Sequence, residues 1–193
     1  MMCLQPEVSR QHFQEFSRDE RIMLLELAHR SIAAALAGRE LLLEPPTPHL
    51  AEPRGVFTTL YHRASLRGCV GHVFPDSSVY RTVADTARAA ALEDTRFYPV
   101  NAAEAQELEV SLSILSVLKP IRPEDVDVGV HGLLISMAGR RGLLLPQVPL
   151  EHKWDRVQYL EQTCRKAGLA NDAWHSGAKL EAFTAEVFSD REM

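Results

Sequence analysis

Residues 65–72 read Ser-Leu-Arg-Gly-Cys-Val-Gly-His, and this stretch decides how the surrounding chain is interpreted. A glycine inside a run that otherwise reads as a strand marks a bulge, or a place where a ligand or another backbone comes close. Here two glycines flank Cys69, while Arg67 and His72 supply a cation and an imidazole that would favour a thiolate. The stretch predicts a strand that carries a candidate reactive thiol, although an inert core cysteine is the commoner arrangement.

The residues on either side of this stretch complete a hairpin and a helix. Residues 56–61 are rich in β-branched and aromatic side chains, and a short polar connection joins them to the strand predicted over 66–74. Residues 75–78 then turn the chain into a helix over 79–91, whose small inner residues predict close packing against the sheet.

The N-terminal part of the chain predicts an arm and then a helix. Residues 1–16 show no hydrophobic period and are expected to form a flexible arm. Ser17 and Glu20 form a capping box that begins a helix, and Gly38 is a natural residue to end it. The proline-rich residues 44–48 predict an extended surface linker.

The C-terminal half repeats the same kinds of element. Its patterns predict a short helix capped by Asn101 and Glu104, a half-buried strand over 108–114, a hairpin around 138–142, a helix over 154–164 that holds Cys164 in the core, and a closing strand over 180–188. Hairpin, helix and strand thus occur twice. The predicted fold class is α+β with mainly antiparallel sheet and packed helices.

Composition excludes several functional classes. The 193 residues are 46% hydrophobic and 24% charged with a net charge of −5, so no basic field predicts nucleic-acid binding. The longest apolar runs, such as 32–37, are far shorter than the roughly 20 residues that span a bilayer. Residues 1–10 lack the pattern of a signal peptide, so we expect a cytoplasmic protein without a membrane partner.

The cysteines do not predict a disulfide framework or a metal centre. There are 3, without a Cys-x-x-Cys pair, as expected for reduced thiols. Cys69 and His72 have ligand-like spacing, but positions three apart on a strand point to opposite faces unless a bulge intervenes. Since two further ligands are missing, we expect no metal and no cofactor.

The signature and the blocks that follow it resemble a known family. Residues 66–71, Leu-Arg-Gly-Cys-Val-Gly, are similar to the LRGCIG signature of the AMMECR domain family, with Val70 in place of the usual Ile. Later blocks match in the same order, and the similarity covers roughly 17–189; these blocks lie at 94–99, 109–115, 132–133, 144–148, 151–154, 164–169 and 174.

The resemblance implies a fold and a set of partners more than a reaction. It implies one domain over 17–190, an α+β fold of two interlocked subdomains with the signature lining a cleft between them. The family's biochemical role is unsettled. Related bacterial and archaeal proteins are similar to protein A of a three-part system with a Memo-like protein and a radical-SAM enzyme, which are the partners that the resemblance implies.

Two hypotheses for the site follow. In the first, Cys69 acts as a nucleophile or carrier while Arg67 holds an anionic group of a small molecule. The general base stays open among His72, His62 and Glu151. The other residues expected to line such a site are Leu66, Gly68, Gly71, His72, Arg96, Gln147 and Glu151.

In the second hypothesis the chain is a non-catalytic ligand-binding or adaptor module, and the glycines only let chains approach each other. For Arg96 the alternative to a ligand contact is a salt bridge to Asp94 or to a neighbouring Glu. Gln147 either faces the cleft or satisfies a buried backbone group. If Arg67 lies in a buried salt bridge, the signature is chiefly architectural.

Overall fold

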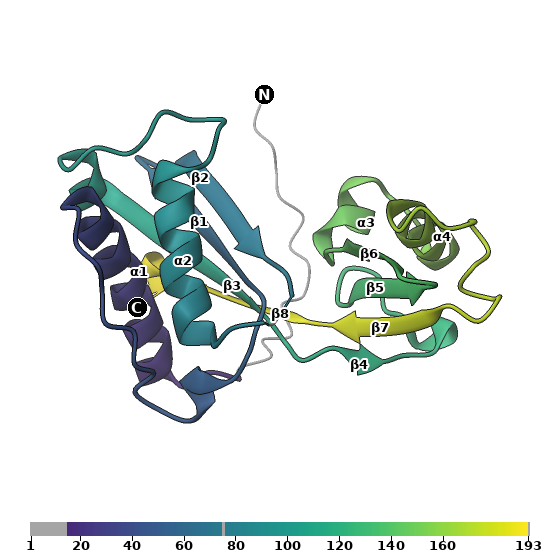
Figure 1. Cartoon of the computed structure of the whole chain (residues 1–193). Coiled ribbons are helices and arrows are strands. Elements are labelled where there is room, and N and C mark those ends of the chain that lie inside the picture. Colours follow the sequence, from purple (N-terminus) through teal and green to yellow (C-terminus); the bar gives the residue numbers. More distant parts are fainter. Residues whose placement is uncertain (1–14, 75, 193) are drawn as a thin grey trace.

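Two antiparallel sheets, each covered by helices, form two lobes (Figure 1). The structure is a computed structural model that describes residues 15–74 and 76–192. The first lobe holds a sheet of order β2-β1-β3-β8, with elements α1 Arg18–Leu36, β1 Val56–His62, β2 Ser65–His72, α2 Val79–Leu92, β3 Leu108–Leu115 and β8 Ala185–Ser189.

The second lobe holds a sheet of order β4-β7-β5-β6. Its elements are β4 Lys119–Pro120, β5 Gly132–Met137, β6 Arg140–Leu144, α3 Gln147–Glu151, α4 Arg156–Lys166 and β7 Lys179–Phe183. Each lobe has its own buried hydrophobic cluster. The mixed α+β class with antiparallel sheets is therefore confirmed.

The first helix begins and ends where its sequence signals place it. The Ser17 side chain accepts a hydrogen bond from the Glu20 backbone N–H, and the Glu20 carboxylate accepts one from the Ser17 N–H. Gly38 has φ +63° just beyond the last turn, a conformation that favours glycine. Residues 1–14 of the predicted arm lie outside the described part, whereas Phe16 is buried against the core.

The β1–β2 hairpin is confirmed, and it contains a bulge inside the signature. Its turn residues Arg63 and Ala64 both have positive φ, as in the tight two-residue turns that suit the strand twist. The pairing shifts between Leu60, opposite Gly68, and Tyr61, opposite Leu66. Arg67 is therefore the additional residue, and a bulge of this kind redirects a side chain.

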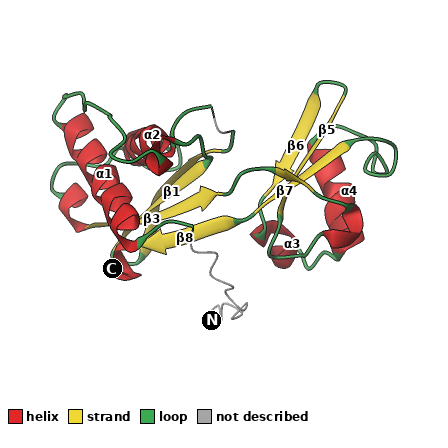
Figure 2. Ribbon diagram, turned by 90° about the horizontal axis from the view of Figure 1, so that it is seen from below, coloured by secondary structure: helices red, strands yellow, loops and turns green. Residues whose placement is uncertain are grey.

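Helices α1 and α2 both cover one face of the first sheet (Figure 2). The fit of α2 depends on Gly68, because a Cβ there would overlap the carbonyl oxygen of Ala90. The inner alanines of α2, including Ala87 and Ala90, are buried, as the small residues in its sequence predict.

The second hairpin and the helix after it are also confirmed. Ala138 and Gly139 turn the chain between β5 and β6 with positive φ. Asp155 and Gln158 form a capping box at the start of α4, and Cys164 is fully buried. Trp154 precedes this helix and Val157 is 49% exposed, so the inner face is narrower than the predicted one.

The predicted closing strand over 180–188 is two strands in two sheets. β7 pairs with β5 in the second lobe, whereas β8 pairs with β3 in the first. Ala182 and Phe183 are both buried, so the alternation breaks where the chain changes lobes. Thr184 marks the crossing: its N–H donates to Ser116 Oγ (3.0 Å), and its C=O accepts from the Ser116 N–H (2.9 Å).

The chain therefore crosses between the lobes twice, once after β3 and once before β8. Within the described residues, none of the helices has the length and apolar character needed to cross a membrane.

Candidate functional site

The signature strand β2 is the outermost strand of its sheet, and a neighbouring loop covers its free edge at Cys69. The Cys69 backbone N–H donates to Asp94 Oδ2 (2.8 Å), and the Cys69 C=O accepts from Arg96 Nη2 (3.2 Å). Asp94 and Arg96 also form an ion pair at 2.6 Å. The salt bridge that the sequence offered as the alternative for Arg96 is thus confirmed.

Asp94 is strongly stabilised as a carboxylate. Its side chain is 7% exposed. Hydrogen bonds from the Arg96 guanidinium and then from the Cys69 N–H hold the pKa of this carboxyl well below its usual range, against the opposing effect of burial. The loop carrying Asp94 is therefore fixed to β2 at physiological pH.

The Cys69 thiol lies on the sheet face away from α2, because the neighbouring Gly68 faces that helix. Its residue is half-buried, and the Thr59 hydroxyl on β1 donates to Sγ at 3.4 Å. Cys164 is different: it is fully buried, and burial raises the pKa of its thiol. The two thiols therefore differ in accessibility as the sequence predicted.

Arg67 is held by a carboxylate rather than left open for a ligand. Its Nε and Nη2 donate to the two oxygens of Glu104, and Nη2 also donates to the Tyr98 C=O (2.9 Å). The Arg67 and Glu104 side chains are each 16% exposed. The Arg67 hydrogen bonds lower the pKa of Glu104, and the Arg67 guanidinium lies 5.8 Å from the Phe97 ring centroid.

The two glycines of the signature are positions of close approach. Gly68 makes room for the backbone of α2 at Ala90, and Gly71 makes room for the Phe57 ring, which a Cβ would overlap. Both glycines therefore have a packing reason that needs no ligand.

His72 lies on the other face of β2 from Cys69, whereas Leu66, which pairs with Tyr61 beyond the bulge, lies on the same face as Cys69. His72 is exposed and its Nε2 is 2.8 Å from Asp76 Oδ1, and Leu66 is 44% exposed. Since no register shift separates positions 69 and 72, the thiol and the imidazole point to opposite faces. This arrangement does not form the Cys-x-x-His metal pair that the spacing suggested.

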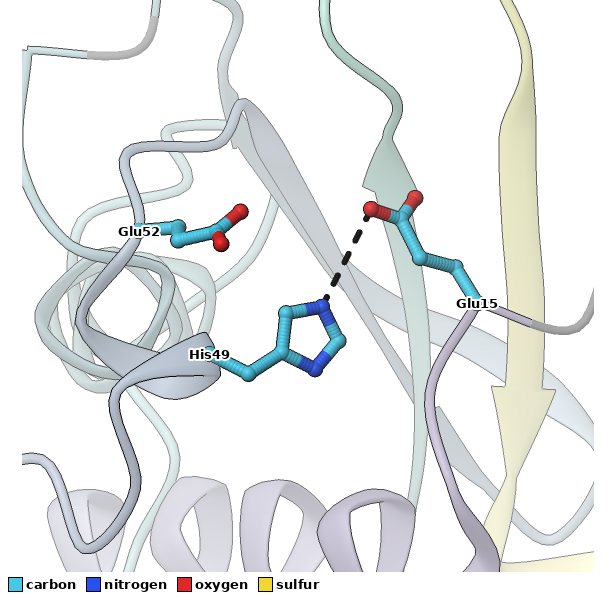
Figure 3. Close-up of side chains that lie close together, drawn as sticks. All are labelled: Glu15, His49 and Glu52. Atoms are coloured by element: carbon cyan, nitrogen blue, oxygen red, sulfur yellow. Dashed lines mark ion pairs between the residues drawn. The ribbon is translucent and has the colours of Figure 1, made fainter.

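Among the described residues, a different group of side chains comes close enough to hold a metal ion: Glu15, His49 and Glu52 (Figure 3). A cation is already present there, because Arg54 Nη2 lies 2.6 Å from Glu15 and 2.8 Å from Glu52. The Arg54 side chain is 6% exposed. We therefore interpret this cluster as an ion-pair network of half-buried and exposed side chains around the buried Arg54, which anchors Glu15.

The other two predicted site residues lie in the second lobe. Gln147 and Glu151 are the first and last residues of α3, and both are exposed. In the described ranges, no hydrogen bond or ion pair links either of them to β2. That they complete a site with Cys69 stays a prediction.

Two hollows adjoin the signature strand. A small cavity of about 40 Å³ lies between the lobes and is lined by Val73, Leu143 and Phe183 among others. A larger one of about 240 Å³ lies between β2 and α2 and is lined by Val70, Gly71, His72, Thr82, Asp85 and Thr86 among others. Neither lining set includes Cys69 or Arg67.

Sequence reasoning missed that Asp94 accepts from the Cys69 backbone and that Glu104 holds Arg67. Both stood in recognised patterns, Asp94 in a block that resembles the family and Glu104 in a predicted helix cap. Neither pattern could show that these carboxylates reach β2, 25 and 37 residues earlier in the chain.

The fold and site define a two-lobed α+β protein with a glycine-containing edge strand. The model of the AMMECR1 family matches residues 25–188. The chain is 38% identical over 180 residues to a protein of Methanosarcina acetivorans, an alignment that covers 87% of this chain and 90% of that one. It is 40% identical to a protein of Thermococcus gammatolerans, with 86% and 88% covered.

A solved structure agrees with this assignment. The crystal structure of PH0010 from Pyrococcus horikoshii superposes with a TM-score of 0.67 at 38% identity, covering 86% of this chain and 89% of that one. The chain belongs to the AMMECR1 family.

Proposed function

We propose that this chain is a non-catalytic binding module and that its signature is a scaffold rather than a catalytic centre. One observation carries this proposal: neighbouring residues already bond to the side chain of Arg67 and to the backbone of Cys69, and the Arg67 Nη1, which has no hydrogen-bond partner among the described residues, is buried. Glu104 holds the Arg67 guanidinium, while Asp94 and Arg96 hold the Cys69 backbone.

Competition explains why this arrangement argues against anion binding by Arg67. A small anion would have to displace a carboxylate that makes a two-pronged contact in a site that is 16% exposed. Such pairs are stronger than ordinary hydrogen bonds, and separating them leaves a charge without a partner. An anionic substrate at Arg67 therefore requires rearrangement of the short 3-10 helix Glu104–Glu107, which carries this carboxylate.

The partners that the family resemblance implies are a Memo-like protein and a radical-SAM enzyme. A module without its own reaction fits an assembly in which another protein performs the chemistry. In this proposal the chain binds at least one of them through its first lobe. The cytoplasmic location expected from the sequence is part of the same proposal.

Calorimetric titration tests this function. The full chain is titrated against the purified Memo-like protein and the purified radical-SAM enzyme of its own organism. We expect association with at least one of them, with the Kd of Cys69→Ser within about twofold of the wild type. Absence of association with both, or loss of association in Cys69→Ser, would contradict the proposal.

Thiol chemistry at Cys69 is the second candidate. It is favoured by the Thr59 hydroxyl that donates to Sγ and by the half-buried position of the thiol on the sheet face away from α2. In the described part of the chain, no imidazole or carboxylate is hydrogen-bonded to the thiol. A base would have to come from a partner, so this candidate also depends on an assembly.

A further inference from the structure

The edge of β2 already shows what kind of partner it accepts. At Cys69 the free edge receives a carboxylate oxygen for its N–H and a guanidinium N–H for its C=O. These are the acceptor and donor that a neighbouring strand would offer from its backbone. Asp94 and Arg96 thus take the place of a pairing strand at this one position.

The next outward-facing residue on this edge has no such substitute. Cys69 pairs with Thr59 and Gly71 pairs with Phe57 without a register shift between them, so the Gly71 backbone faces away from β1 as Cys69 does. Gly71 is exposed, and in residues 15–74 and 76–192 no side chain or loop hydrogen-bonds to its N–H or C=O. Unpaired edge groups of this kind are a template for another chain.

A groove runs beside this open position. The cavity of about 240 Å³ has Val70, Gly71 and His72 along one side. Thr82, Asp85, Thr86 and Ala89 of α2 form the other side. Figure 1 shows β2 beside α2 at the rim of the first sheet. A groove between an edge strand and a helix accepts an extended peptide that adds a strand, and its volume is smaller than the roughly 300–1,000 Å³ of small-molecule pockets.

The charged side chains along the groove indicate the charge of the peptide that it binds. His72 is paired with Asp76, and Arg88 is paired with Glu93 at 2.9 Å. Asp85 is exposed and forms no hydrogen bond or ion pair with any described residue. Asp85 is therefore the charged residue of the groove lining that has no partner among the described residues, with the exposed Arg81 and the Arg88–Glu93 pair one α2 turn away on either side.

We propose that the groove between β2 and α2 binds an extended, basic segment of a partner protein. The segment pairs with the Gly71 N–H and C=O as an additional strand and places a Lys or Arg against Asp85. This inference deepens the proposed function, because it names the kind of partner that a binding module of this shape takes.

The test uses ¹⁵N-labelled full-length protein and three short peptides. The probe is acetyl-Val-Lys-Val-Lys-Val-amide, and the controls are its glutamate counterpart and a copy N-methylated on alternate backbone nitrogens. We expect the lysine peptide to shift the amide signals of Gly71, His72 and Ala89 at about 5 mM, with neither control doing so. Absence of shifts at Gly71 with the lysine peptide, or equal shifts with the N-methylated one, would overturn the proposal.

Two exposed carboxylates provide a matched pair of charge reversals. Asp85→Lys should weaken binding of the lysine peptide at least about fivefold, because attraction becomes repulsion. Glu26→Lys, the same change on an exposed position of α1, should leave it unchanged. Ala89→Phe fills the groove without changing charge and should also abolish the shifts. Binding that survives both Asp85→Lys and Ala89→Phe would place the peptide elsewhere.

The outcomes separate this inference from the proposed function. If the lysine peptide leaves Gly71 unshifted while the chain still binds the Memo-like protein, the groove proposal fails and the binding module stands. If the peptide binds in the groove while neither the Memo-like protein nor the radical-SAM enzyme associates, the groove stands and those partners are wrong.

Discussion

The outer strands of the two hairpins, β2 in the first lobe and β6 in the second, share one packing device. Gly68 lets β2 contact the backbone of α2 at Ala90, and Gly142 lets β6 contact the backbone at the end of α4 near Ala167. The two strands differ in what surrounds the glycine. β2 has a bulge, a carboxylate for its arginine and a loop fixed to its edge, whereas Arg140 of β6 donates to the Gly168 C=O.

This comparison indicates which part of the signature bears on function and which part serves packing. A glycine required for helix packing occurs in both lobes and needs no ligand to explain it. What distinguishes β2 is the set of side chains that hold it from outside the sheet. The functional question therefore concerns the edge of β2 and its surroundings rather than the glycines themselves.

The largest expected effect belongs to the glycines. Gly68→Ala and Gly142→Ala should each lower the free energy of unfolding by about 2–4 kcal/mol, because a Cβ would overlap backbone atoms that cannot rotate away. Urea unfolding measures the change. Gly38→Ala is the control: it has open space but φ +63°, so a loss of about 1–2 kcal/mol is expected. Equal losses at all three positions would refute the packing explanation.

The next largest effect on stability is the difference between substituting Arg67 on β2 and substituting Arg140 on β6. Arg67→Ala should cost about 1–3 kcal/mol, because it leaves the partly buried Glu104 carboxylate without its partner. This exceeds the change of about 1 kcal/mol expected for a partly exposed site residue. Arg140→Ala in the second lobe should cost less than about 1 kcal/mol, since Arg140 is exposed. A neutral Arg67→Ala would show that Arg67 is free for a ligand.

A smaller effect concerns the loop on β2 and depends on pH. The folded state lowers the pKa of Asp94, so this carboxyl adds stability that is present above about pH 4 and is lost as the pH falls toward its folded pKa. Asp94→Asn should be less stable than the wild type by about 1–2 kcal/mol at pH 7, and the difference should shrink below about pH 4.

Thermal unfolding from pH 7 to pH 3 measures this convergence. Asp155→Asn, at the exposed cap of α4, is the matched control and should change stability by less than about 1 kcal/mol. A pH-independent difference between Asp94→Asn and the wild type would contradict the role of the Asp94 carboxylate.

The last prediction concerns the reactivity of the two cysteines and expects no change in stability. Limiting iodoacetamide near neutral pH should label Cys69 before Cys164, because Cys69 is half-buried whereas burial raises the pKa of Cys164. A Cys3→Ser background removes the third thiol, and mass mapping reads the adducts. Faster labelling of Cys164 would contradict the second candidate function.

Much of the fold could be predicted because its signals are local. The capping box at Ser17 and the β-branched run before β2 each act over a few residues, and both were confirmed. The switch of sheets at Thr184 was missed, since an extended segment looks the same whether it stays in one sheet or changes to another.

The site was predictable only in part, for a different reason. The strand and the thiol follow from residues 65–72, whose glycines predicted either a bulge or a close approach without deciding between them. The partners of Arg67 and Cys69 do not, because Glu104 and Asp94 reach β2 across long stretches of chain whose path only the tertiary structure determines. The open edge at Gly71 is likewise a property of the sheet order and not of any motif.

The double crossing at Ser116 and Thr184 has a consequence for synthesis on the ribosome. The second lobe lies wholly between β3 and β8, so it emerges and can close before the last strand of the first lobe exists. Until then the outer side of β3 lacks its neighbour, and an unpaired strand invites contact with other nascent chains. A truncation between β7 and β8 leaves the first lobe permanently without β8, although most of the residues of that lobe are present.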